Sequence, residues 1–325
     1  MSASAPPTAL ALIAPAMQQV DRVIHDRLTT GVPLVAQVSQ YIISAGGKRL
    51  RPAMLLLMAE ALEYKGEQHY SLAAVVEFIH TATLLHDDVV DESTLRRGRP
   101  TANASFGNPA SVLVGDFLYS RSFQMMVETQ NMRVMDILAN ATNIISEGEV
   151  LQLMNMHDAS LNEADYLHVI RSKTAKLFEA STRLAAVLAG CDAEQEERCA
   201  EYGQALGTAF QIIDDVLDYD GAAVEMGKNL GDDLREGKAT LPLIAAMQRA
   251  SAAESEVIKS AIEHGRTEQL EEIVRIVRDT GALEVARACA AAEAERAIAS
   301  ISSLTSSEYQ SCLVQLAAQL LGRRT

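Results

Sequence analysis

The positions of proline constrain the fold of this chain more than any other feature of its sequence. All eight prolines lie at positions 6, 7, 15, 33, 52, 100, 109 and 242, so residues 110–241 and 243–325 contain none. Proline breaks a helix interior, whereas the Ala, Leu, Met, Glu and Gln that fill these stretches favour helix. Apolar or small residues recur three and four apart, as in Ile137-Ala141-Ile144-Gly148-Leu151, and alternating strand patterns are absent. The sequence therefore predicts an all-α fold, with one domain over residues 1–325.

Breaks between helices are predicted where turn-forming residues gather. They are expected at residues 46–47, 96–108, 157–162, 190–194, 220–237 and 264–267. Residues 1–17, in which Ser, Ala and Pro are prominent, are predicted to be weakly ordered.

Charge and cysteine content exclude several function classes. The formal net charge of −15 argues against nucleic acid and anionic membrane surfaces as partners. No stretch reaches the roughly 18 apolar residues that span a bilayer, and the apolar run at 9–14 lacks the basic flank of a secretory signal. The four cysteines have neither zinc-site spacing nor the density of a disulfide scaffold. We expect a cytoplasmic protein with reduced thiols and no stable membrane insertion.

Two copies of one acidic pattern, at 87–91 and 214–218, lie inside apolar sequence that predicts helix. Residues four apart share a helix face, so the repeated aspartates stack like charges and weaken the helix. One copy alone is typical of a solvated acidic face, but two copies with basic residues nearby indicate a bound cation. Hard oxygen ligands in incomplete clusters favour Mg²⁺, which shares its coordination with substrate phosphates. The candidate metal ligands are Asp87, Asp88, Asp91, Asp214, Asp215 and Asp218.

Basic residues around the first motif predict phosphate binding. Arg96 and Arg97 follow it closely, and their planar guanidinium groups suit diphosphate oxygens. Upstream, the pair Gly46-Gly47 leads into Lys48-Arg49-Leu50-Arg51 just before an expected helix. Flexible backbone and cations at a helix start form a phosphate cradle.

Further cations accompany the second motif. Lys173 and Thr174 lie inside an expected helix, and Lys228 and Lys238 flank the loop beyond Asp218. Each lysine taken singly is typical of a protein surface. In an acidic protein their placement suggests a positively charged lid over a diphosphate.

These segments together resemble the trans-type polyprenyl diphosphate synthases. The matching residues are 46–52, 80–100, 173–174, 210–218 and 227–242, and residues 77–86 look most like the octaprenyl members found in bacteria. The resemblance implies an isoprenoid synthase fold, in which antiparallel helices surround a deep cavity. It also implies a homodimer with two or three Mg²⁺ ions per active site, held by the two aspartate motifs from opposite walls.

The resemblance implies a Mg²⁺-dependent prenyltransferase that adds isopentenyl diphosphate successively to an allylic diphosphate, with farnesyl diphosphate as the expected primer. The product would be octaprenyl or nonaprenyl diphosphate for a quinone side chain. Family matching gives the catalytic residues as Asp87, Asp88, Asp91, Arg96, Lys173, Asp214 and Lys228. It assigns Arg96, Lys173, Gln211 and Lys228 to the allylic diphosphate, Lys48, Arg51, His80 and Arg97 to isopentenyl diphosphate, and Thr174 and Phe210 to the reacting carbons, with Lys238 also binding substrate.

The chemistry of these residues agrees with that reaction. Departure of a diphosphate from an allylic carbon needs cations that stabilise the developing negative charge. No side chain is an obvious general base, so we expect the released diphosphate to accept the proton. Water must be excluded from the resulting allylic cation, which accounts for an apolar cavity and a closing basic loop.

Product length is predicted by residues that precede the first motif on its helix. Thr83 and Ala82 lie four and five positions before Asp87, one turn deeper. Bulky aromatic residues close the cavity at these positions in short-chain members of the family, whereas both residues are small here. The product should therefore be long, and the candidate cavity floor is Met126 with Leu138, although such residues usually form ordinary core.

Other interpretations remain open. A terpene cyclase shares the all-α scaffold and the first motif, but its second metal motif normally carries Asn, Ser and Glu rather than repeated aspartates. A regulatory subunit of a heteromeric synthase would lack the acidic motifs, and an acidic helical interaction protein would not bind diphosphate with Mg²⁺. The stripe formed by Leu313, Leu316, Leu320 and Leu321 could pack on the core, line a dimer interface or touch a membrane.

Overall fold

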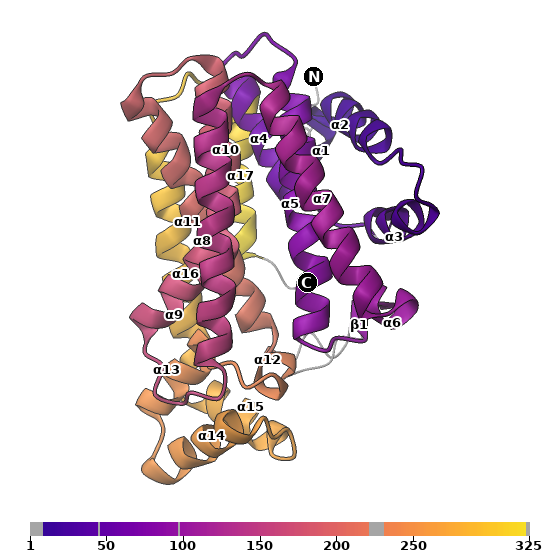
Figure 1. Ribbon diagram of the computed structural model, residues 1–325. Helices are drawn as coiled ribbons and strands as arrows, with labels where there is room; N and C mark the ends of the chain where they lie inside the picture. The colour runs from indigo at the N-terminus through magenta and orange to yellow at the C-terminus, as the bar shows by residue number, and fades with distance from the viewer. Residues whose placement is uncertain (1–8, 45, 97, 221–230, 323–325) are drawn as a thin grey trace, which may run out of the picture. The chain divides into compact units, whose positions relative to one another are not determined.

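The structure is a computed structural model that describes residues 9–44, 46–96, 98–220 and 231–322. Within these ranges the regular structure is helical except for one antiparallel hairpin, in which Leu95 pairs with Pro100 and Arg96 with Arg99 (Figure 1). The all-α prediction is confirmed. None of the helices in these ranges is both long and apolar enough to cross a membrane.

The chain divides into two compact units, each described separately below. Unit 1 comprises residues 1–142, 180–199 and 304–313, and unit 2 comprises residues 143–179, 200–303 and 314–325. The single domain over residues 1–325 stays a prediction.

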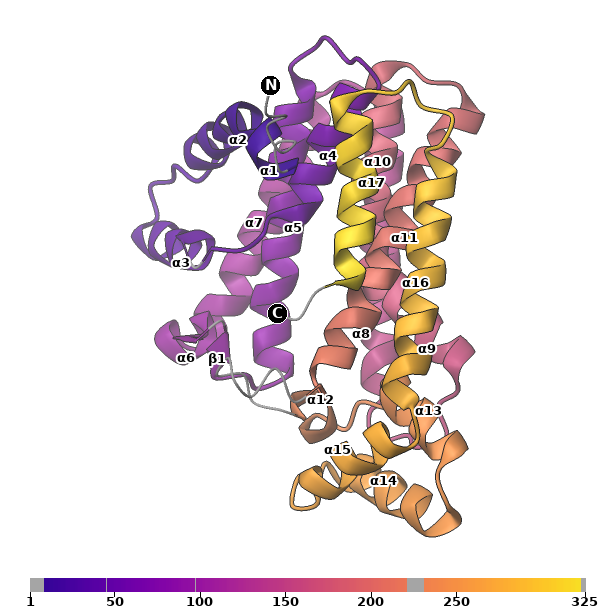
Figure 2. The same ribbon diagram turned by 180° about the vertical axis from the view of Figure 1, so that it is seen from behind.

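Unit 1 is built around the long helix α5, which packs against α2, α4 and α7. Helices α5 and α7 run side by side in Figures 1 and 2. Pro52 to Ala59 of α4 are all buried, as is typical of a helix enclosed on every side. The elements of unit 1 are α1 (Ala9–Leu12), α2 (Ala14–Arg27), α3 (Pro33–Ser44), α4 (Leu50–Ala61), α5 (Gln68–Val90), β1 (Leu95–Arg96), β2 (Arg99–Pro100), α6 (Ala102–Phe106) and α7 (Asn108–Glu128).

Unit 2 gathers its shorter helices around α13, which contacts α9, α14, α15 and α16. Helices α13, α14 and α15 lie close together at the bottom of Figure 2. The elements of unit 2 are α9 (Glu163–Ile170), the π-helical turn η1 (Arg171–Ala175), α12 (Asp232–Arg235), α13 (Leu241–Arg249), α14 (Ala252–His264), α15 (Leu270–Asp279) and α16 (Ala282–Ser300).

Four helices contribute residues to both units: α8 (Met132–Asn155), α10 (Lys176–Ala189), α11 (Ala193–Leu217) and α17 (Glu308–Leu321). Leu313 and Leu320 of α17 are buried, so the core alternative for the C-terminal leucine stripe is supported for these two residues.

The predicted breaks at 46–47, 157–162, 190–194 and 264–267 fall at helix ends. The break at 96–108 also holds the hairpin and α6, and α12 lies inside the break at 220–237. Of residues 1–17, which are predicted to be weakly ordered, residues 9–12 and 14–17 are helical.

The turn η1 carries Lys173 and Thr174 and lies against α8 and α11 at two glycines. A Cβ at Gly207 would lie 2.7 Å from the Cα of Ala175, and one at Gly148 would lie 2.8 Å from the backbone nitrogen of Lys173. Both distances are too short for real Cβ contacts. These two glycines, each costing helix stability, therefore permit the close approach that holds η1 in place.

The substitution Gly207→Ala should destabilise the protein although alanine favours helix. An alanine methyl would overlap the backbone at Ala175, and overpacking of this kind costs about 1–3 kcal/mol. We expect a lower melting temperature in a calorimetric scan. Gly31→Ala is the control because no atom would lie within 4 Å of a Cβ added at that position. A Gly207→Ala protein at least as stable as the wild type would contradict the close packing.

Candidate active site

The first aspartate motif lies at the C-terminal end of α5, where the hairpin returns an arginine to it. Asp88 is fully buried, and its Oδ1 accepts hydrogen bonds from Nε and Nη2 of Arg96 at 3.0 and 2.7 Å. The Asp88 backbone carbonyl accepts from the Asn103 amide at 3.0 Å. The predicted metal ligand and the predicted phosphate-binding arginine are thus bound to each other. Asp87 and Asp91, on the same stretch of chain, are half-buried.

The predicted phosphate cradle leads into α4. Gly46 has a left-handed φ of 74° and Arg49 one of 43°, so the backbone turns sharply before the helix begins. Lys48 is exposed, whereas Arg51 is partly buried with Nη1 3.2 Å from Nε2 of His80. Burial lowers the pKa of Arg51 to about 10, against the opposing effect of Glu77. A guanidinium held in this way would gain from an anion beside it.

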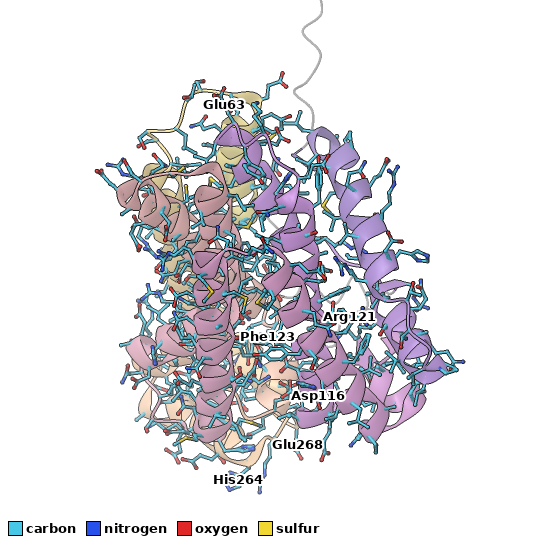
Figure 3. The ribbon with its side chains drawn as sticks, turned by 45° about the horizontal axis from the view of Figure 1, so that its top comes forward. Glu63, Asp116, Arg121, Phe123, His264 and Glu268 are labelled. Carbon is cyan, nitrogen blue, oxygen red and sulfur yellow. The ribbon has the colours of Figure 1, made fainter. Side chains whose placement is uncertain are left out.

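His86 joins the acidic end of α5 to α7. Its Nε2 lies 3.1 Å from the backbone oxygen of Val112 and 3.4 Å from Oδ1 of Asp116. Because both neighbours only accept, Nε2 carries the proton. Asp116 is labelled on α7 in Figure 3, with Arg121 and Phe123 farther along the same helix.

The second motif lies at the C-terminal end of α11 and has buried hydrogen-bond donors. Asp215 is buried; its Oδ2 accepts from the Tyr166 hydroxyl at 2.6 Å and its Oδ1 from the Gln211 amide at 2.8 Å. The amide oxygen of Gln211 in turn accepts from the Thr174 hydroxyl at 3.0 Å. One network therefore joins α9, η1 and α11.

Asp218 holds the loop that follows the second motif. Its carboxylate accepts from the backbone N–H groups of Asp232 and Asp233 at 3.3 and 3.2 Å. Its backbone carbonyl accepts from the N–H of Gly231 at 3.3 Å. Asp218 thereby fixes the start of α12, and Lys238, which follows α12, pairs with Glu236.

Burial raises the pKa values of these acids. The pKa of Asp215 rises to about 7, because desolvation outweighs the Tyr166 and Gln211 hydrogen bonds. The pKa of Asp218 rises to about 6 for the same reason, although backbone donors oppose the rise. Asp233, which lines the same region, has a pKa well above its usual range, raised first by burial and then by the charges of Asp215 and Asp218. Unit 2 therefore concentrates negative charge that protein donors compensate incompletely.

A cavity of about 140 Å³ opens beside the second motif within unit 2. Five residues predicted from the sequence line it: Lys173, Thr174, Gln211, Asp215 and Lys238. Lys173 also pairs with Glu149 of α8 at 2.5 Å. The cavity thus combines carboxylates, two lysines and apolar walls, which suits a ligand with a charged head and an apolar body.

Other predicted residues are not among those that line this cavity. Phe210 packs on Phe178 with ring centroids 5.7 Å apart. Ala82, Met126 and Leu138 are buried in unit 1, and Thr83 is half-buried with its hydroxyl donating to the His80 carbonyl at 2.8 Å. Arg97 and Lys228 lie outside the described residues.

Sequence reasoning missed three residues of the cavity region: Tyr166, Asp233 and Glu149. Tyr166 lies seven positions before Lys173, so the helical period alone would have placed both on one face. Glu149 and Asp233 act through contacts that are distant in sequence, and no local pattern marks them.

The donor set fits a hard divalent cation that also binds substrate. Among the described residues, no three His, Cys, Asp or Glu side chains are arranged to hold a metal ion by themselves. Mg²⁺ usually takes only one or two carboxylates and completes its shell with waters and substrate phosphates. The carboxylates of either motif match this incomplete coordination.

The chain is similar to known proteins along most of its length. Residues 32–280 match the family model described as polyprenyl synthetase. The chain is 49% identical over 307 residues to octaprenyl diphosphate synthase of Escherichia coli, covering 94% of this chain and 95% of the relative. It is 46% identical over 315 residues to an all-trans-nonaprenyl-diphosphate synthase (geranyl-diphosphate specific) of Rhodobacter capsulatus, covering 97% of both chains.

One solved structure is similar over its whole length. It is a polyprenyl synthase from Caulobacter crescentus complexed with calcium and isoprenyl diphosphate, with a TM-score of 0.94, 43% identity and complete coverage of both chains. That protein therefore holds calcium and isoprenyl diphosphate on a similar fold.

The raised pKa of Asp215 predicts how stability changes with pH when no metal is bound. Because folding raises this pKa from 3.8 to about 7, the folded protein holds a proton that the unfolded chain has lost. The stability that this bound proton contributes is fully present below about pH 4 and is lost as the pH rises through about 7. We therefore expect the melting temperature in chelator to fall between about pH 5 and pH 8, and to fall less in Asp215→Asn. Equal falls in the two proteins would contradict the assignment.

Proposed function

We infer, because this chain belongs to the polyprenyl synthetase family, that it is a prenyltransferase that makes long-chain all-trans polyprenyl diphosphates. The observation that carries this function is the match along nearly the whole chain to octaprenyl and nonaprenyl diphosphate synthases. The two aspartate motifs and the small residues before the first of them are consistent with it.

The proposed reaction is the successive condensation of isopentenyl diphosphate onto an allylic diphosphate, with farnesyl diphosphate as primer. We propose a product of eight or nine isoprene units that serves as a quinone side chain. Incubation of the purified protein with farnesyl diphosphate and labelled isopentenyl diphosphate, followed by mass spectrometry of the products, tests both statements. Products no longer than four units would overturn the long-chain assignment.

We propose that Mg²⁺ is the cofactor, with two or three ions per active site held by the aspartates of both motifs. Bound Mg²⁺ would supply positive charge to the departing diphosphate. Asp87, Asp88, Asp91, Asp214, Asp215 and Asp218 are the proposed ligands. Protein donors already hold three of these carboxylates in place, those of Asp88, Asp215 and Asp218.

The cationic side chains are proposed to bind the two diphosphates. Arg96, Lys173, Gln211 and Lys228 would hold the allylic diphosphate, and Lys238 would also bind substrate. Lys48, Arg51, His80 and Arg97 would hold isopentenyl diphosphate. Burial of Arg51, which lowers its pKa, supports this role because an anion would restore its charge balance. The released diphosphate would accept the proton that the condensation frees.

The apolar residues are proposed to set product length. Ala82 and Thr83 occupy one turn of α5 before Asp87 and carry short side chains. A prenyl chain that grows from the first motif could pass them. Met126 and Leu138, both fully buried, would then form the floor of the cavity.

A second copy of this chain is the proposed partner, giving a homodimer. Large apolar side chains stay exposed in each unit: Leu113 and Met132 in unit 1, and Val150, Leu153 and Met154 in unit 2. Such exposed apolar groups mark interaction surfaces.

The proposed location is the cytoplasm. All four cysteines are free thiols, which supports a reducing compartment.

Loss of the first aspartate of either motif should abolish most activity. Asp87→Ala or Asp214→Ala removes a proposed metal ligand that stabilises the transition state, so kcat should fall by about 10²-fold or more. Incorporation of labelled isopentenyl diphosphate at saturating Mg²⁺ measures this effect. The control is Asp136→Ala, whose carboxylate is 67% exposed on α8. Near-normal turnover in either variant would mean that the mutated carboxylate is not a ligand.

A bulky side chain before the first motif should shorten the product. Ala82→Phe or Thr83→Tyr would block the proposed path of the growing chain while leaving the diphosphate sites intact, so products should lose several isoprene units without loss of turnover. Chromatography of the dephosphorylated products measures their length. Ala139→Phe, at an exposed position of α8, is the control. An unchanged product distribution in both variants would remove Ala82 and Thr83 from the path.

A further inference from the structure

A tyrosine that the proposed mechanism does not use lies against the second aspartate motif. Tyr166 belongs to α9, whose first turn is fixed by the Asn162 side chain accepting from the Asp165 N–H at 3.0 Å. Tyr166 is buried, with 3% of its surface exposed, and it lines the cavity of unit 2. A buried hydroxyl on a capped helix is a rigid hydrogen-bond donor.

The Tyr166 hydroxyl is committed to Asp215. The oxygen–oxygen distance of 2.6 Å is that of a hydrogen bond to a charged acceptor, which is about twice as strong as one between neutral groups. Tyr166 donates this hydrogen bond and Oδ2 of Asp215 accepts it. Its donation occupies Oδ2 and leaves Oδ1 for Gln211.

The donor and acceptor of the other hydrogen bonds in this network can also be assigned. Gln211 has its NH₂ at one end of the amide and its oxygen at the other, and the NH₂ must face Asp215 because a carboxylate only accepts. The amide oxygen therefore faces Thr174, whose hydroxyl must donate. The lone pairs of the Thr174 oxygen are thus directed away from Gln211.

We propose that Tyr166 is a positioning residue for prenyl transfer: by anchoring the Asp215 carboxylate, it fixes the orientation of the Gln211 amide and, through it, of the Thr174 hydroxyl. The proposal rests on the proposed function, in which Thr174 lies beside the reacting carbons, where positive charge develops. Oxygen dipoles oriented before the reaction stabilise such charge without reorganising. Without the Tyr166 donor, the Asp215 carboxylate can turn, and the directions of Gln211 and Thr174 are no longer specified.

The substitution Tyr166→Phe tests the proposal because it removes one oxygen and keeps the ring. The expected kcat is about tenfold lower than in the wild type, the size of effect seen when a supporting partner of a catalytic group is lost. The KM for isopentenyl diphosphate should change less than about twofold, because no member of the network belongs to that proposed binding site. Because Gln211 is assigned to the allylic diphosphate, affinity for farnesyl diphosphate alone, measured by calorimetry with Mg²⁺, should fall as well, but by a smaller factor than kcat, since the larger part of the effect belongs to the transition state.

Tyr219→Phe is the matched control. Tyr219 is fully buried and directly follows the same motif, but its hydroxyl makes no hydrogen bond with the motif in the described ranges of the chain. This variant should retain wild-type kcat. Equal kcat values for the Tyr166→Phe and Tyr219→Phe proteins, whether both normal or both lowered, would overturn the proposal.

A double-mutant cycle tests the route of the effect. Gln211→Ala alone should lower kcat at least as much as Tyr166→Phe, and adding Tyr166→Phe to it should cost less than about a further twofold, because residues in one network are not additive. If the losses of kcat in the two single variants multiply in the double variant, the proposal is overturned. Normal turnover in Gln211→Ala would also overturn it, and this result does not depend on whether the Tyr166→Phe protein folds. If the wild type fails to condense the two diphosphates, the proposed function falls. If the wild type is active and the cycle is additive, only the role of Tyr166 falls.

Discussion

The structure depends on donors and cations that compensate the negative charge of carboxylates buried at the ends of long apolar helices. A buried charge is costly unless donors or cations surround it. Asp88 is compensated by Arg96 of the hairpin, and Asp215 by a tyrosine and a glutamine. Asp218 is compensated by backbone N–H groups at the start of α12. Each aspartate thus organises the chain that follows it or packs on it.

Compensation of the buried carboxylates in unit 2 is incomplete. The pKa values of Asp215 and Asp218 rise in spite of their donors, since burial and neighbouring acids outweigh them. A site that resists full ionisation on its own is stabilised by a cation. In unit 1, Arg96 supplies positive charge beside the first motif, and Arg51 is a cation whose charged form burial disfavours. A bound metal ion would compensate the acids of unit 2, and a bound diphosphate would compensate the buried cation of unit 1.

The sequence predicted the features that follow from periodicity, and it missed those that depend on distant contacts. The proline distribution and the three-and-four spacing were enough for the helices, and Lys173, Thr174, Gln211 and Asp215 do line one cavity. Tyr166 escaped notice because an isolated tyrosine on an amphipathic helix is typical of the core. The hairpin that turns Arg96 back to Asp88 also has no strong local signal, since its strands are two residues long.

The π-helical turn shows why local propensity could not predict the site geometry. In a regular α-helix, at about 100° per residue, Lys173 would lie on the face of Tyr166, but Thr174 would lie about 80° around the axis. A turn with i to i+5 hydrogen bonds winds more slowly, so Thr174 rotates less and stays near that face. All three residues can then line one cavity. The close approach of η1 to Gly148 and Gly207 stabilises this underwound segment, so two glycines far away in sequence govern which side chains line the cavity.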